Sequence, residues 1–247
     1  MIRKKSIAII AHRGYCSWHP ENTIPAIKAA WCTAADGVEV DARLTKDNKV
    51  ALIHDPHTGR VADKTLYVRN TTYRELRKLD FGAGVAIPLL TDMLATVPPK
   101  RRVFIEPKCN EVITPLAEII RCCSVAPEQI LFLGYEKNVD IRILKKTFPD
   151  YPVHLVVEVD ENTDFTGNHI AQQAVEKGVD GVQIGHPHGK YLRRINRDFV
   201  KSIKRAGLSF QVWTVNEHVR AKRLMAAGVD GITTDKPELL TKCLFGD

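Results

Sequence analysis

The feature that most restricts the fold of this chain is a regular alternation of short apolar runs with helical patterns. Eight runs have the length and β-rich composition of buried strands, at residues 6–11, 37–41, 103–106, 130–133, 153–157, 180–184, 209–213 and 230–233. Each is followed by helical spacing, at about 23–35, 89–97, 115–122, 139–147, 169–177, 197–206, 217–227 and 237–244. Strands that alternate with helices form parallel sheets, so these units predict an α/β fold, a single (β/α)8 TIM barrel. The length of 247 residues suits that architecture.

The second unit is longer than the others. Its strand at 37–41 is followed by a second strand-like piece at 49–54 and then by a polar, loop-rich stretch to about Gly84. We therefore expect one domain over residues 1–247, with an insertion at about 54–88 in the loop region after strand 2. Loops that follow barrel strands lie at the end where active sites are built.

Acidic side chains stand on two neighbouring predicted strands. Glu39 and Asp41 are two residues apart and so share one face of their strand, and Glu106 and Lys108 repeat the spacing on the next. Isolated buried carboxylates are costly, and a divalent cation removes that penalty. Three carboxylates at the barrel mouth therefore indicate a site for magnesium or calcium. The plainer alternative is that Glu106 and Lys108 pair with each other or are exposed.

Two histidines follow strand-like runs, His12 after the first strand and His54 after residues 50–53. Cleavage of a phosphodiester requires a base for the attacking oxygen and an acid for the leaving oxygen, and histidine serves as either near neutral pH. Arg13, beside His12, offers a forked donor that suits phosphate oxygens. A structural role for either histidine is the alternative, and the neighbouring metal site favours catalysis.

Charge and cysteine content exclude some classes of protein. A formal charge of +7 and a pI near 9.1 favour anionic ligands, but the basic residues form no stripe with aromatic residues, so a nucleic-acid binder is not expected. Six cysteines without zinc or redox spacing are typical of reduced thiols and of a cytoplasmic protein. No apolar run approaches ~18 residues, so no transmembrane segment is predicted.

Short motifs occur in order along nearly the whole chain: AHRG at 11–14, PENT at 20–23, GVEVD at 37–41, LTKD at 44–47, HD at 54–55, IEPK at 105–108, VWTVN at 212–216 and GVDGITTDKP at 228–237. Each motif is weak by itself, whereas the ordered set is specific. Together they resemble the glycerophosphodiester phosphodiesterase family.

The resemblance implies a role for nine positions. They are the metal ligands Glu39, Asp41 and Glu106, the acid–base pair His12 and His54, the phosphate contacts Arg13 and Lys108, Glu21 near metal and substrate, and Trp213 as an aromatic wall of the pocket. The cofactor is then one divalent cation, Mg²⁺ or Ca²⁺, with Mn²⁺ as a further option. The insertion at 54–88 is expected to cap the site and to select the alcohol group of the substrate.

Some motif residues have a plainer interpretation. Asn22 and Thr23 suit the N-terminal cap of the first helix, and Trp213 suits core packing on an inner strand. Asp235, ahead of Lys236-Pro237, is interpreted as the N-cap of the last helix.

The expected activity is metal-dependent hydrolysis of small glycerophosphodiesters to glycerol 3-phosphate and an alcohol by His/His acid–base catalysis. One alternative is a lyase or lysophospholipase D that acts on lysolipids and yields a cyclic phosphate. Another is a catalytically silent binding barrel, which the presence of every metal carboxylate and both histidines disfavours. The alcohol group and the oligomeric state stay open.

Overall fold

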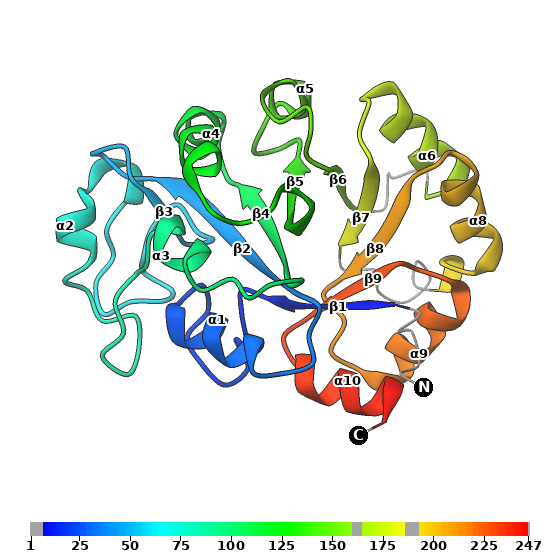
Figure 1. Ribbon diagram of the computed structural model, residues 1–247, viewed down its shortest axis with the longest axis horizontal. Helices are drawn as coiled ribbons and strands as arrows, with labels where there is room; N and C mark the ends of the chain where they lie inside the picture. Colours follow the sequence, from blue (N-terminus) through cyan, green and yellow to red (C-terminus); the bar gives the residue numbers. More distant parts are fainter. Residues whose placement is uncertain (1–6, 160–164, 186–192, 247) are drawn as a thin grey trace.

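The computed structural model describes residues 7–159, 165–185 and 193–246, and within these ranges the chain forms a closed barrel of parallel strands with helices outside it (Figure 1). Each of the barrel strands pairs with the next barrel strand along the chain, and the last pairs with the first. The strands are β1 (Ala8–His12), β2 (Gly37–Leu44), β4 (Arg102–Pro107), β5 (Ile130–Tyr135), β6 (Val153–Glu158), β7 (Gly181–Gly185), β8 (Ser209–Trp213) and β9 (Gly231–Thr234). The predicted TIM barrel is confirmed, and Ser6, in the first predicted strand, lies outside the described residues.

The predicted helices are present, with their ends shifted by a few residues. They are α1 (Ile24–Trp31), α3 (Leu90–Leu94), α4 (Ile113–Cys122), α5 (Ile141–Thr147), α6 (Gly167–Glu176), α8 (Arg197–Arg205), α9 (His218–Ala227) and α10 (Pro237–Phe245). The side chain of Thr23 accepts a hydrogen bond from the backbone of Ala26 and so caps α1, as its sequence position suggested. Gly228 ends α9 in the left-handed conformation, with φ of 96°.

The barrel has an outer and an inner layer of apolar side chains. Val38 and Val40 point outward from β2 and are fully buried among residues that pack against the helices. Inside the barrel, Ile10, Phe104 and Leu133 belong to a separate cluster. This alternation leaves every second residue of β2 directed inward, so a polar residue at such a position must find its partners inside the barrel.

The segment after β2 is more ordered than its polar sequence indicated. β3 (Val50–Leu52) pairs antiparallel with β2, and η1 (Val68–Asn70) and α2 (Tyr73–Leu76) follow. Its apolar side chains form a small core of their own, made of Ala51, Ile53, Val68, Leu76, Leu79, Phe81 and Ile87. The segment forms a folded lobe on one side of the barrel, cyan in Figure 1. Side chains of the lobe are therefore held in place beside the barrel mouth.

The shorter one-turn elements η2 (Asn110–Val112) and η3 (Pro127–Gln129) precede α4 and β5. In the described part of the chain, no helix combines the length and apolar character needed to cross a membrane.

Candidate active site

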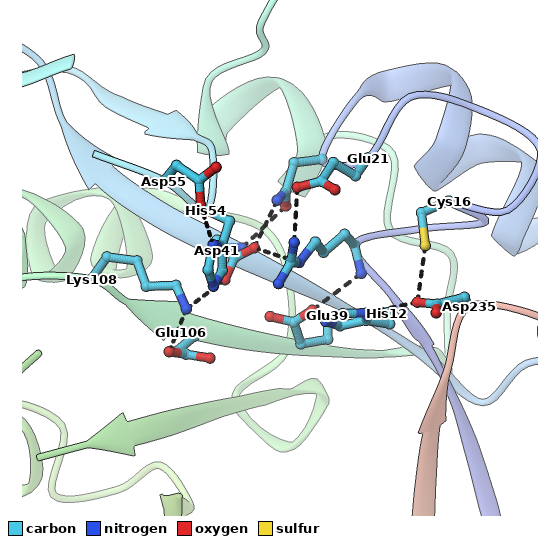
Figure 2. Close-up of polar contacts among 12 residues, drawn as sticks. His12, Cys16, Glu21, Glu39, Asp41, His54, Asp55, Glu106, Lys108 and Asp235 are labelled. Atoms are coloured by element: carbon cyan, nitrogen blue, oxygen red, sulfur yellow. Dashed lines mark hydrogen bonds and ion pairs between the residues drawn. The ribbon is translucent and has the colours of Figure 1, made fainter. Parts of the chain in front are cut away.

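Three carboxylates meet inside the carboxyl end of the barrel. β2 and β4 pair in a register that places Asp41 opposite Glu106, and Glu39 lies two residues before Asp41 on the same face. These side chains belong to residues that are 3% (Glu39), 1% (Asp41) and 6% (Glu106) exposed. One oxygen of each lies within 4.8 Å of the others. The strand alternation expected from sequence thus produces a compact acidic cluster (Figure 2).

The electrostatics of this acidic cluster suit a hard divalent cation. Burial, and then the charge of Asp41, raise the pKa of Glu39 well above its ordinary value. Burial opposes ionisation of Asp41 as well, but Lys108 and Arg13 outweigh it and lower the pKa of that carboxyl. The cluster thus offers oxygen ligands alone, and a bound divalent cation would favour the ionised form of Glu39, which is the donor chemistry that magnesium and calcium require.

Lys108 lies within the acidic cluster, with its Nζ 2.9 Å from Asp41 Oδ1 and also hydrogen-bonded to Glu106. Glu106 and Lys108 therefore do pair with each other, as the plainer alternative expected. Neither residue is exposed, which was the other form of that alternative. Burial opposes a charge on Lys108, but Asp41 and Glu106 raise its pKa, so the ammonium stays charged.

Arg13 directly follows β1 and reaches over the same carboxylates. Its Nε lies 3.1 Å from Asp41 Oδ2, its Nη1 donates to Glu21 Oε1 over 2.9 Å, and its backbone N–H donates to Glu39 Oε2 over 3.1 Å. Burial opposes the charge, but Asp41, Glu39 and Glu21 raise the pKa of Arg13. Arg13 and Lys108 together place two fixed cations beside the cluster.

Asn22 is a clamp on Asp41 and not a helix cap. Its Nδ2 donates to Asp41 Oδ2 over 2.8 Å, and its Oδ1 accepts from the backbone N–H of Asp41 over 3.1 Å. Asn22 is 2% exposed and has a left-handed φ of 56°, a conformation that asparagine tolerates better than most residues. The cap interpretation is therefore wrong for Asn22, because its side chain turns into the barrel mouth.

His12 is held by Asp235. The Nδ1 of His12 lies 2.7 Å from Asp235 Oδ1, and its Nε2 lies 3.9 Å from Glu39 Oε2. An ionised carboxylate only accepts hydrogen bonds, so Nδ1 carries a proton, and Nε2 faces the acidic cluster. Burial opposes ionisation of Asp235, but its hydrogen bond from His12 lowers its pKa.

The interpretation of Asp235 as a helix N-cap is wrong. Lys236 occupies the N-cap of α10, and no side chain caps that helix. Asp235 instead accepts hydrogen bonds from Asn216 Nδ2 over 2.6 Å and from Cys16 Sγ over 3.1 Å, in addition to His12. The carboxylate of Asp235 reaches His12 because β9 ends next to β1 in the closed barrel. The two residues are more than 200 positions apart in the chain.

His54 is held in the same way by its neighbour in the chain. Its Nδ1 lies 2.7 Å from Asp55 Oδ1, and Arg60 Nε donates to Asp55 Oδ2 over 2.7 Å. Burial, and then the cations Lys108 and Arg13, lower the pKa of His54. In Figure 2, the pair His12 and Asp235 lies on one side of the carboxylates and the pair His54 and Asp55 on another.

A cavity of about 590 Å³ opens at this end of the barrel. Its lining residues are His12, Arg13, Cys16, Ser17, His19, Pro20, Glu21, Arg60, Val61, Phe81, Asn216, Asp235 and Lys236. Of the nine positions singled out in the sequence, His12, Arg13 and Glu21 contribute to this wall. Glu21 accepts hydrogen bonds from both Arg13 and Arg60, the latter two of 2.8 Å, so the lobe after β2 is tied to the PENT motif.

Trp213 ends β8 and is partly buried against the inner core. Its ring centroid lies 6.1 Å from that of His12. It is not among the residues that line the cavity described above. Core packing therefore accounts for most of its surroundings, and its ring also flanks a site histidine.

Several residues of the site were not singled out in the sequence. Asp55 and Asp235 belong to motifs that were recognised in the sequence, but the sequence did not show which residues they would hydrogen-bond to. Asn216 ends the VWTVN motif, and its hydrogen-bond partner could likewise not be read from the sequence. Arg60 lies in the lobe and carries no motif, so only the fold could place it on Glu21.

Comparison with known proteins shows which proteins this chain resembles in sequence and fold. A model of the glycerophosphoryl diester phosphodiesterase family matches residues 12–239. A glycerophosphodiester phosphodiesterase of Caldanaerobacter subterraneus subsp. tengcongensis is 31% identical over 243 residues, which is 94% of this chain and 95% of that protein. Among solved structures, an Oleispira antarctica phosphodiesterase in complex with the product sn-glycerol-3-phosphate has a TM-score of 0.84 at 21% identity and covers 96% of each chain. A Thermotoga maritima glycerophosphodiester phosphodiesterase has a TM-score of 0.80 at 23% identity, over 97% of this chain and 99% of that one.

Proposed function

The chain belongs to the glycerophosphoryl diester phosphodiesterase family, and from that premise we propose how it acts: it hydrolyses small glycerophosphodiesters to glycerol 3-phosphate and an alcohol, with a divalent cation and two histidines. The observation that carries the proposal is the arrangement of His12 and His54 around a buried acidic cluster, each with its Nδ1 2.7 Å from an aspartate. The product glycerol 3-phosphate is taken from the complex of the Oleispira protein.

Glu39, Asp41 and Glu106 are the residues that would hold the cation, and their oxygens suit Mg²⁺ or Ca²⁺, with Mn²⁺ as a further option. When bound, such an ion supplies Lewis-acid stabilisation of charge on the phosphate oxygens.

The two histidines divide the proton transfers. In each, the hydrogen bond from Nδ1 to an aspartate leaves Nε2 to accept or donate the proton that moves. One Nε2 accepts the proton of the attacking oxygen, from water or from the 2-hydroxyl of the glycerol unit. The other donates a proton to the departing alkoxide, so that the alcohol leaves neutral.

Arg13 and Lys108 stabilise the negative charge that develops on the phosphate. Both cations are already fixed by carboxylates, Arg13 by the buried Asp41 and the partly buried Glu21, and Lys108 by the buried Asp41 and Glu106. Charges held in place before the substrate arrives need no reorganisation during the reaction, which is where such groups act most strongly.

We treat residues 1–247 as one domain in which the insertion at 54–88 caps the site. The support for this role is that Arg60, Val61 and Phe81 of this segment line the cavity together with His12. The alcohol group of the substrate then contacts these residues, and they select among choline, ethanolamine, glycerol and inositol. Glu21 completes the cavity wall on the barrel side, and Trp213 supports that wall by packing beside His12.

The test is phosphodiesterase activity of metal-stripped protein on glycerophosphocholine and glycerophosphoethanolamine, with magnesium, calcium or manganese added back. We expect metal-restored release of glycerol 3-phosphate. Phosphorus NMR of the product distinguishes hydrolysis from the lyase alternative, which would accumulate a cyclic phosphate. Folded protein that releases no product from either substrate with any of the three metals would contradict the proposal.

A further inference from the structure

A second group of metal-ligand atoms lies on the far side of His12 from the acidic cluster. His12 Nδ1, Cys16 Sγ and a carboxylate oxygen of Asp235 all lie within 4.8 Å of one another. Asp235 Oδ1 is the common partner, 2.7 Å from Nδ1 and 3.1 Å from Sγ. Figure 2 shows the three side chains converging from β1, the loop after it and the end of β9.

This set of donors differs in kind from the acidic cluster. A nitrogen, a sulfur and an oxygen ligand are the set that zinc accepts in its tetrahedral sites, with the fourth position left to water. A thiolate selects zinc and softer ions against magnesium and calcium, which prefer oxygen alone. We propose that His12, Cys16 and Asp235 bind zinc or another thiophilic divalent cation, and that this binding inhibits the enzyme.

The geometry requires only a small opening of the group. With metal–ligand distances of about 2.0–2.3 Å, tetrahedral coordination separates the ligand atoms by roughly 3.3–3.6 Å. The hydrogen-bonded distances of 2.7 and 3.1 Å must therefore lengthen by about half an ångström, as the ion replaces the two protons that now lie between the atoms. Cys16 stands in the loop between β1 and α1, where such a shift is easily accommodated.

The surroundings already orient the carboxylate and leave a path to it. Asn216 Nδ2 donates to Asp235 Oδ2 over 2.6 Å, and Asn216 Oδ1 accepts from the backbone N–H of Asp235 over 2.9 Å. This leaves Oδ1 directed at His12 and Cys16, in the way that a second layer of hydrogen bonds orients a metal ligand. His12, Cys16 and Asp235 all line the cavity of about 590 Å³, so an ion enters by the route of the substrate.

Inhibition follows from the two nitrogens of one imidazole, and this step rests on the proposed role of His12. An ion on Nδ1 displaces the proton that now points to Asp235, and the neutral ring then carries its proton on Nε2. The thiol proton of Cys16 is released to solvent. With Nε2 already protonated in a neutral ring, His12 can no longer accept the proton of the attacking oxygen, and it is a much weaker proton donor than an imidazolium, so either of the two roles is lost. The acidic cluster remains free for its own cation.

The binding test is a cadmium titration of the full chain with magnesium in excess. The readout is the ultraviolet charge-transfer absorption of the cadmium–thiolate bond. The wild-type protein and the control variant C109S, which removes another partly buried cysteine, are expected to show one equivalent of the band. C16S, and C16A as a second variant, are expected to lose it. A band that persists in both Cys16 variants would overturn the site and leave the proposed function untouched.

The inhibition test is the rate of phosphodiester cleavage with magnesium in excess and zinc increased, each variant being compared with its own rate without zinc. Removing a hydrogen-bond partner of a metal ligand typically weakens metal binding at least ~10-fold, and removing the ligand itself should weaken it at least as much. C16S should therefore require at least ~10-fold more zinc for half-inhibition. If cadmium binds through Cys16 but zinc leaves the wild-type rate unchanged, the inhibitory half is overturned, and the fault then lies with the role assigned to His12.

Discussion

The substitution Asp235→Asn tests how His12 is prepared for catalysis, because the structure determines which way the new amide must face. Asn216 Oδ1 accepts from the backbone N–H of Asp235 and from Thr234 Oγ1, so the Nδ2 of Asn216 must point at residue 235. An asparagine there turns its oxygen toward Asn216 and its NH₂ toward His12. The Nδ1 of His12 must then accept, which moves the ring proton to Nε2.

The magnitude follows from the two hydrogen bonds exchanged. The present charge-assisted bond favours the Nδ1–H form by about 1.5–3 kcal/mol, and the neutral bond from an amide favours the opposite form by about 0.5–1.5 kcal/mol. The sum of about 2–4.5 kcal/mol changes the ratio of the two ring tautomers ~30–2000-fold. The Nδ1–H form then becomes the minor one by about 0.5–1.5 kcal/mol, so the population of this working tautomer falls ~3–13-fold. The carboxylate that stabilises the imidazolium formed during the reaction is lost as well. We expect kcat/KM of D235N to fall ~100-fold, with most of the loss in kcat. D235A removes the bias without reversing it and should lose less.

The assay is the initial rate of glycerol 3-phosphate release over a range of pH, with magnesium in excess, for wild type, D235N and D235A. The control is D150N, the same change at an exposed aspartate outside the site, which should keep the wild-type rate. Thermal unfolding of each variant checks that the fold is retained. D235N with a wild-type rate, or with a rate above that of D235A, would refute the tautomer reasoning.

Further predictions concern the histidines, the acidic cluster and the barrel interior. H12A and H54A should each lower turnover at least ~100-fold with an unchanged circular dichroism spectrum; near-normal rates in both would contradict the acid–base pair. N22A removes the clamp on Asp41 and should weaken magnesium activation ~10–100-fold in a metal titration, with activity recovered at high magnesium; an unchanged titration curve would mean that the clamp is not needed. Burial lowers the pKa of His154 to about 4, whereas the unfolded chain binds the proton near its ordinary value of about 6.5. The unfolded state thus binds more protons between these values, so the free energy of unfolding should fall by roughly 3 kcal/mol as pH drops from about 6.5 to 4. Urea unfolding should show this loss in the wild type and a flatter dependence in H154Q; equal slopes would reject it.

The barrel could be predicted from the sequence because each of its elements carries a local signal. Strands and helices differ in hydrophobic period, and the strand 209–213 was located to the residue. The lobe after β2 was predicted only as a loop-rich stretch. Its core joins Ala51, Phe81 and Ile87, which are far apart in the chain and show no period of their own.

The acidic cluster was also within reach of sequence, since side-chain alternation within β2 and β4 is a local property. Glu39, Asp41, Glu106 and Lys108 are therefore found together as expected. The errors concern Asn22 and Asp235, both interpreted as helix caps. Each has the residue type and position of a cap, and local preference could not show that a better partner lay on or beside a neighbouring strand of the barrel.

By itself, the sequence determined the alternation of strands and helices, the faces on which the carboxylates lie, and the ordered motifs that identify the family. Tertiary structure alone decided which side chains of separate segments meet: Asp235 with His12 and Cys16, Asn22 with Asp41, and Arg60 with Glu21. For Asp235, the physical reason is barrel closure. Pairing of β9 with β1 brings the last motif of the chain beside the first, and no local pattern of residues encodes a contact that depends on the ring being complete.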